Sequence, residues 1–328
     1  MKHDVKFNRV GVYPGFSNEE YHTGPGVSKS SLDVVDKSPA HFKQSRLAGY
    51  KKSTPAQKRG TMFHTIVLEP ETFWDCYAKP FEEPAGALKT ADDIKSRLKE
   101  LGLPTNGTKP VLTDRLREAD PDVIFLDEAK AAYADAVGKK EIITEEELAT
   151  VEAMRDAVMA HPRAGKLFAP KSGVAELSCY WKDQETGVLC RCRPDWWRFD
   201  GKIVDLKSAA DASPEGFEAS MAKWSYYKQD PFYLDGASEA VKQGPDHGMP
   251  APTAFIFVAC EPEAPHAVGV YVLGQEEREI GRRHYRKSLE TYAECEAKDE
   301  WPAYSDRIEP IGLPGWFLRK EAYENEGE

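Results

Sequence analysis

Apolar positions recur with helical spacing along much of the chain. Within 90–101 they lie three or four residues apart, and Thr144 followed by Glu147 is a capping-box signature for a helix that ends near Met159. Residues 60–68 are apolar nearly all round, which predicts a buried helix. Further helices are predicted at 28–36, 39–46, 111–116, 214–242 and 275–297.

Strand character replaces this pattern between residues 172 and 210. The predicted strands there are 174–181, 188–198 and 202–207, and two later ones fall at 254–259 and 267–273. Helices on both sides of these strands predict an α/β fold with a central mixed sheet and an antiparallel hairpin. We expect 1–86 to form an N-terminal helical part, 87–120 a small helical insertion, and 121–328 the core with the C-terminal helices.

Composition limits the class of protein. A chain of 328 residues can form one large domain or two smaller ones. Its net charge of -11 means that any contact with nucleic acid must use a local basic patch. No apolar run reaches the roughly 20 residues of a membrane span, and residues 1–6 lack the apolar segment of a secretory signal. The six cysteines include no CxxC pair, which argues against a zinc ribbon, and they are best explained as small buried side chains in a reducing cytoplasm. We therefore expect a cytoplasmic protein, and the missing apolar run predicts no membrane contact.

The candidate chemistry lies in the hairpin that ends at residue 207. Side chains alternate along a strand, so Asp205 and Lys207 share one face. Buried charged groups of this kind must be paired or must bind something. Asp200-Gly201 marks the turn. A two-residue loop would direct Asp195 away from Asp205, whereas a three-residue loop with a left-handed Gly201 would place the two carboxylates opposite each other.

We predict the three-residue loop. Opposed residues have Cβ atoms about 5 Å apart, and two carboxylates that close repel unless a cation lies between them. Mg²⁺ or Mn²⁺ suits such oxygen ligands. Lys207 lies further along the same face, where an ammonium can orient water or offset charge on a phosphoryl group. From these residues alone, a salt-bridge cluster on the sheet surface is an equally good explanation.

A family resemblance favours the metal site over the salt-bridge cluster. Pro194-Asp195 followed by Asp205-x-Lys207 matches the PD-(D/E)XK nuclease motif, and most of the chain outside 80–120 resembles the RecE-type exonuclease (exonuclease VIII) branch of that superfamily. The segments that carry the resemblance are 25–30, 38–41, 60–70, 176–178, 193–196, 205–208 and 300–305.

The resemblance implies roles for further residues. His64 matches the histidine that completes the metal site with Asp195 and Asp205. Glu176 matches an acidic residue near the metals, although a plain salt bridge within the sheet explains it as well. The remaining matches are candidate DNA contacts: Arg193 beside the motif, and Gln229 with Tyr233 in a Gln-x-x-x-Tyr motif that Pro231 interrupts. If Pro231 began a new helix, Gln229 would lie outside it.

Residues 88–120 resemble a SAP motif, a small helical DNA-binding module. The match depends on apolar positions such as Ile94, Leu98 and Leu112 and on the loop around Gly107. The alternative is a helical insertion with a solvated basic face. Basic residues that could contact phosphates there are Lys95, Arg97, Lys99, Lys109 and Arg115.

The resemblance implies a Mg²⁺-dependent exodeoxyribonuclease, with Mn²⁺ able to substitute. Such an enzyme degrades linear double-stranded DNA from its ends, 5′ to 3′, and leaves 3′ single-stranded tails for phage-like recombination. The implied partners are double-stranded DNA ends, a single-strand annealing protein and further copies of the chain in a homo-oligomeric ring. The alternatives are an inactive DNA-binding protein that uses the SAP-like segment, and an iron–sulfur nuclease, against which the cysteine pattern argues.

Overall fold

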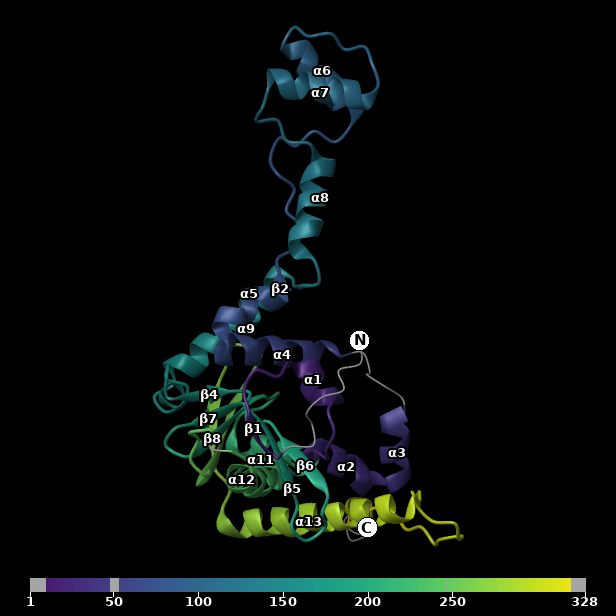
Figure 1. Ribbon diagram of the computed structural model, residues 1–328, viewed down its shortest axis with the longest axis vertical. Coiled ribbons are helices and arrows are strands. Elements are labelled where there is room, and N and C mark those ends of the chain that lie inside the picture. The colour runs from purple at the N-terminus through teal and green to yellow at the C-terminus, as the bar shows by residue number, and fades with distance from the viewer. Residues whose placement is uncertain (1–9, 48–52, 246, 320–328) are drawn as a thin grey trace, which may run out of the picture.

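The computed structural model describes residues 10–47, 53–245 and 247–319, so the expectation about a secretory signal in residues 1–6 lies outside the described part (Figure 1). A five-stranded mixed sheet forms its centre, in the order β10-β9-β8-β7-β4. Only β8 and β9 run parallel, and the other neighbours are antiparallel. Its strands are β4 (Gly173–Ala175), β7 (Trp196–Arg198), β8 (Lys202–Ser208), β9 (Ala254–Cys260) and β10 (Val268–Tyr271).

A three-stranded antiparallel sheet lies beside it, in the order β1-β5-β6. Its strands are β1 (Gly11–Tyr13), β5 (Ser178–Lys182) and β6 (Leu189–Cys192). The predictions of unbroken strands at 174–181 and 188–198 are therefore wrong. Each of these stretches supplies a strand to both sheets and bends between them, at 176–177 and at 193–195. We call these two bends the sheet junction.

The hairpin has the predicted three-residue loop. Trp196 pairs with Val204 and Trp197 with Ile203, a register that extends to Asp195 opposite Asp205. Gly201 has φ +79°, the left-handed conformation that glycine adopts without strain. Val204 and Leu206 pack into the apolar core on one face of the sheet, so Asp205 and Lys207 face the other side, as the alternation predicts.

Helices cover both faces of the five-stranded sheet. One face packs against α4 (Pro55–Leu68) and α9 (Glu145–Ala160), and the other packs against α11 (Pro214–Lys223) and α12 (Tyr226–Gln243). No helix in the described residues is long and apolar enough to cross a membrane. The other helices are α1 (Asn18–Thr23), α2 (Lys29–Lys37), α3 (Pro39–Leu47), η1 (Pro70–Thr72), α5 (Phe73–Cys76), α6 (Ala91–Glu100), α7 (Lys109–Ala119), α8 (Leu126–Val137), α10 (Ala164–Leu167) and α13 (Gln275–Lys298).

Residues 88–120 contain two helices, α6 and α7, close to the predicted positions. Their apolar side chains form a small separate core with Phe125, and the loop between them is held by Arg115, whose guanidinium donates to the carbonyls of Pro104 and Asn106. Figure 1 shows this pair at the far end of a stalk that includes α8. A short parallel sheet of β2 (Tyr77–Ala78) and β3 (Glu141–Ile142) lies at the base of the stalk.

Helix α12 continues through Pro231. Proline has no N–H, so the carbonyl of Tyr227 lacks the donor that an ordinary helix would give it. Helix α13 crosses at this point, and a Cβ added to Gly281 would lie 1.9 Å from that carbonyl oxygen. The expectation that Pro231 would leave Gln229 outside the helix is therefore wrong, because Gln229 lies within α12.

Replacement of glycine by alanine should have opposite effects on stability at two helix positions, 281 and 60. Gly281→Ala should destabilise the protein by about 1–3 kcal/mol, because the added methyl group overlaps the backbone of α12. Gly60→Ala should stabilise it by about 0.5–1 kcal/mol, because Gly60 lies inside α4 and a Cβ added there would meet no atom within 4 Å. Urea unfolding of both variants measures the difference, and equal midpoints would contradict the close helix crossing.

Candidate metal and active site

Helix α4 presents two different faces, which the sequence pattern did not reveal. It begins at Pro55, capped by Thr54, and not at residue 60. Met62, Phe63, Ile66 and Val67 are buried. The opposite face lines a cavity, so the prediction of a helix buried all round is wrong; the α4 residues that line the cavity are Gln57, Gly60, Thr61, His64 and Thr65.

At the sheet junction, His64 meets two carboxylates. One ligand atom each from His64, Glu176 and Asp195 lies within 4.8 Å of the others. The Nδ1 atom of His64 is 3.7 Å from Oδ2 of Asp195, and that oxygen also accepts a 2.7 Å hydrogen bond from the backbone N–H of Leu206. The hydrogen bond fixes the Asp195 carboxylate against β8.

Asp205 and Lys207 lie next to this group. The Asp205 side chain is 1% exposed, and its Oδ2 atom is 2.5 Å from the Lys207 ammonium. Its Oδ1 atom accepts a 2.5 Å hydrogen bond from the Gln229 amide on α12. Burial and the charge of Asp195 raise the pKa of Asp205 to about 6, against the opposing effect of Lys207.

The Lys207 ammonium stays protonated despite its surroundings. Burial lowers its pKa, but Asp205 and Asp195 more than offset this, so the net pKa lies above the ordinary value. The ammonium is also 4.9 Å from the centre of the Tyr226 ring. Lys207 therefore offers a fixed positive charge rather than a base.

Glu176 occupies an unusual backbone conformation. Its φ is +52°, which non-glycine residues rarely adopt and which the surrounding structure must hold in place. The guanidinium of Arg193 does so: Nε donates to the Glu176 carbonyl at 2.9 Å and lies 3.1 Å from Oε2. Burial, with Asp195 adding to it, raises the pKa of Glu176 to about 8 although Arg193 opposes the shift.

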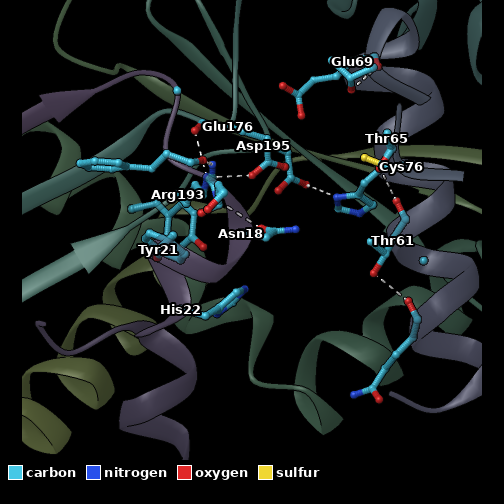
Figure 2. A pocket seen from close by; sticks show the side chains of 18 residues that line it. Asn18, Tyr21, His22, Thr61, Thr65, Glu69, Cys76, Glu176, Arg193 and Asp195 are labelled. Carbon is cyan, nitrogen blue, oxygen red and sulfur yellow. Dashed lines mark hydrogen bonds and ion pairs between the residues drawn. The ribbon is translucent and has the colours of Figure 1, made fainter. Parts of the chain in front are cut away.

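A cavity of about 730 Å³ opens beside these groups, between α1 and α4 (Figure 2). Its far wall includes Asn18 and His22 of α1, which no motif or periodicity in the sequence marks as site residues. Burial and the nearby Arg191 lower the pKa of His22. Uncharged polar side chains make up much of the rest of the lining.

These groups fit a divalent cation. Glu176 and Asp195 crowd two carboxylates into a partly buried space, which raises the pKa of Glu176 and which a cation would relieve. Carboxylate oxygens suit Mg²⁺ and Mn²⁺, and the imidazole extends the choice to other transition metals. The three side chains whose ligand atoms lie close together are therefore His64, Glu176 and Asp195. Asp205 was expected as a ligand with His64 and Asp195, but its carboxylate is held between Lys207 and Gln229.

Cation binding should therefore depend on pH. The unfolded chain loses the Glu176 proton near pH 4.5, whereas the metal-free native protein keeps it until about pH 8. Between those values the native state binds more protons, so its stability falls as pH rises. A cation requires the ionised carboxylate, so we expect its apparent affinity to fall about tenfold for each pH unit below 8. Thermal unfolding with excess Mg²⁺ should show a larger gain at pH 8.5 than at pH 6, and an equal gain would contradict this.

The candidate DNA contacts lie in two places. Gln229 and Tyr233 are one turn apart on α12, and Tyr233 lines the cavity while Gln229 binds Asp205. The Arg193 guanidinium contacts Glu176, Asn18 and the Phe16 carbonyl, so it holds the cavity wall together.

On α6 and α7, at the far end of the stalk, most of the basic candidates for DNA contacts already have protein partners. Lys95 pairs with Asp92, Arg97 with Asp120, and Lys109 with Asp127, and Arg115 holds its own loop. Residues 87–120 contain seven lysines and arginines against six aspartates and glutamates. The net charge of this segment is therefore close to zero, whereas the chain as a whole is acidic.

Comparison with known proteins supports this view of the fold. Residues 28–313 match the family model described as PDDEXK-like domain of unknown function (DUF3799). A crystal structure of a "Putative exonuclease" from Eubacterium rectale superimposes with a TM-score of 0.50 over 93% of this chain and 98% of that one, at 11% identity. No curated protein matches the chain. The chain belongs to the PDDEXK-like family DUF3799, and its mixed sheet with flanking helices is a PD-(D/E)XK nuclease core.

Proposed function

We propose that the protein is a metal-dependent nuclease that hydrolyses DNA phosphodiester bonds at the sheet junction. The single observation that carries the proposal is the meeting of His64, Glu176 and Asp195 within ligand distance, beside the buried Asp205–Lys207 pair. A plain salt-bridge cluster would not need a histidine from a separate helix facing an open cavity. The resemblance to RecE-type nucleases implies a metal site with a histidine from an upstream helix beside the hairpin carboxylates.

His64, Glu176 and Asp195 would hold the cation, with Asp205 adjacent to them. A bound Mg²⁺ or Mn²⁺ supplies a Lewis acid that polarises the phosphate and makes water a better nucleophile. Lys207 places its fixed charge where negative charge grows on the phosphoryl oxygens. Gln229 orients Asp205, and the Leu206 N–H orients Asp195.

The substrate that we propose is linear double-stranded DNA, degraded from its ends in the 5′ to 3′ direction to leave 3′ tails for recombination. The resemblance to RecE-type exonucleases supports this substrate and direction, and the description "Putative exonuclease" of the Eubacterium rectale structure agrees with digestion from an end. A single-strand annealing protein, a homo-oligomeric ring and a cytoplasmic location belong to the same proposal. Further DNA contacts would come from Arg193 and Tyr233 at the cavity and from the basic residues of α6 and α7, where Lys95 and Lys99 lie one turn apart.

Duplexes labelled at one defined terminus test the direction of digestion. One linear duplex carries a label at a 5′ terminus and another at a 3′ terminus, and covalently closed circular DNA of the same sequence is the control. With Mg²⁺, we expect early release of the 5′ label, late release of the 3′ label, and an intact circle. Early release of the 3′ label would reverse the proposed polarity, and cleavage of the circle would indicate an endonuclease.

A further inference from the structure

Glu69 follows the last residue of α4 and lines the same cavity as His64, Glu176 and Asp195 (Figure 2). Its backbone is fixed at both ends of the residue. The N–H donates to the Thr65 carbonyl at 2.9 Å, and the carbonyl accepts from the Thr72 hydroxyl at 3.0 Å. Within the described part of the chain, its carboxylate has no hydrogen-bond or ion-pair partner.

The position is unfavourable for a negative charge. The C-terminal end of a helix carries a partial negative charge, which repels a carboxylate and attracts a cation. Glu69 also acts electrostatically on Glu176, which is close enough for the two charges to oppose each other. The cavity lining has three carboxylates, those of Glu69, Glu176 and Asp195, and a single arginine, whose guanidinium is engaged by its neighbours.

A glutamate that only contacts solvent would not be stabilised at this position. A glutamate that binds a cation would be stabilised there, because the helix end, the cavity and the neighbouring carboxylates all favour a positive charge. Glu69 lies outside the group whose ligand atoms are within 4.8 Å of one another, but on the same helix as His64 and at the edge of the same cavity.

We propose that Glu69 is an additional ligand of the divalent-cation site, so that α4 contributes both an imidazole and a carboxylate. The proposal depends on the metal dependence proposed above. It adds a second residue from the α4 region, one residue past the end of the helix, to the site that His64 already enters.

Titration calorimetry with Mn²⁺ in the absence of DNA tests this directly. We expect Glu69→Gln to weaken Mn²⁺ binding at least tenfold relative to wild type. Glu71→Gln, which removes an exposed carboxylate two residues away, should leave binding unchanged. Glu69→Asp keeps the charge but shortens the side chain, so a direct ligand predicts weakened binding in this variant too. Thermal unfolding of the metal-free variants checks that each one folds.

The outcomes separate the two proposals. Wild-type affinity in Glu69→Gln would overturn the role of Glu69 while leaving the nuclease proposal intact. Wild-type affinity in Glu69→Asp together with weakened binding in Glu69→Gln would reduce Glu69 to a distant charge and overturn its role as a ligand. Absence of Mn²⁺ binding by the wild-type protein would overturn the metal-dependent function itself.

Discussion

Asp195→Asn is expected to abolish both divalent-cation binding and DNA hydrolysis while leaving the fold intact. Asp195 faces His64 and Glu176, and it lies opposite Asp205 in the hairpin register. Loss of an outer partner of a metal ligand typically costs about 10- to 100-fold in affinity or activity, so loss of a ligand itself should exceed that. The amide is isosteric and can still accept the N–H of Leu206 through its oxygen.

Asp200→Asn is the matched control for that variant. Asp200 lies in the turn of the same hairpin and pairs with Arg198 and Lys202 at the surface. Its replacement should change hydrolysis less than about twofold, because exposed ion pairs contribute little. Nucleotide release and Mg²⁺ titration of the two variants form one experiment. Equal activity of Asp195→Asn and wild type would remove Asp195 from the active site.

Lys207→Met should reduce DNA hydrolysis by about 10²- to 10⁴-fold while retaining cation binding. The variant keeps the aliphatic bulk but removes the charge that Lys207 presents near the proposed phosphate position. It also leaves the buried Asp205 carboxylate without its cation, which costs about 3–5 kcal/mol when a buried pair is broken. The pKa of Asp205 is already raised to about 6, so this loss of stability should shrink as pH falls and Asp205 takes up a proton.

Lys202→Met, on the same strand, is the control for the loss of a lysine. Lys202 pairs with the exposed Asp200, so its loss should affect neither hydrolysis nor stability by much. Parallel measurement of turnover, Mg²⁺ affinity and thermal unfolding separates chemistry from folding. Loss of Mg²⁺ binding in Lys207→Met would contradict the assignment of Lys207 to the reaction step alone, because it would show that Lys207 organises the cation site.

The hairpin was predictable from the sequence because its physics is local. Strand alternation places Asp205 and Lys207 on one face. The turn at Asp200-Gly201 allows a loop of two or three residues, and the carboxylate pair that only the longer loop forms is the reason for predicting three. The position of Asp195 opposite Asp205 then follows from counting along the two strands.

The sheet junction was not predictable in the same way. Residues 174–181 and 188–198 have continuous strand character, and only tertiary pairing shows that each stretch leaves one sheet for the other. That bend brings Glu176 beside Asp195, with the backbone held at positive φ by Arg193. The metal-ligand role of Asp205 remains a prediction, as do the DNA contacts on the stalk.

Long-range packing also decided the outcome at Pro231. Propensity argues that a proline should begin a helix or break one. In α12 the helix continues, and α13 packs closely at Gly281 over the carbonyl that Pro231 leaves without a donor. Tyr227 and Gly281 lie about fifty positions apart in the chain, so no local sequence pattern shows their contact. The continuous helix α12 places Gln229 within hydrogen-bond distance of Asp205.

The most direct test of the account is the release of acid-soluble nucleotides from linear duplex DNA by the wild-type protein with Mg²⁺, beside Asp205→Ala. The account predicts digestion by the wild type, its loss on chelation of the metal, and an inactive variant. If the wild-type protein digests no DNA with either Mg²⁺ or Mn²⁺, the nuclease proposal is contradicted, and a DNA-binding protein that uses the α6–α7 stalk becomes the better account.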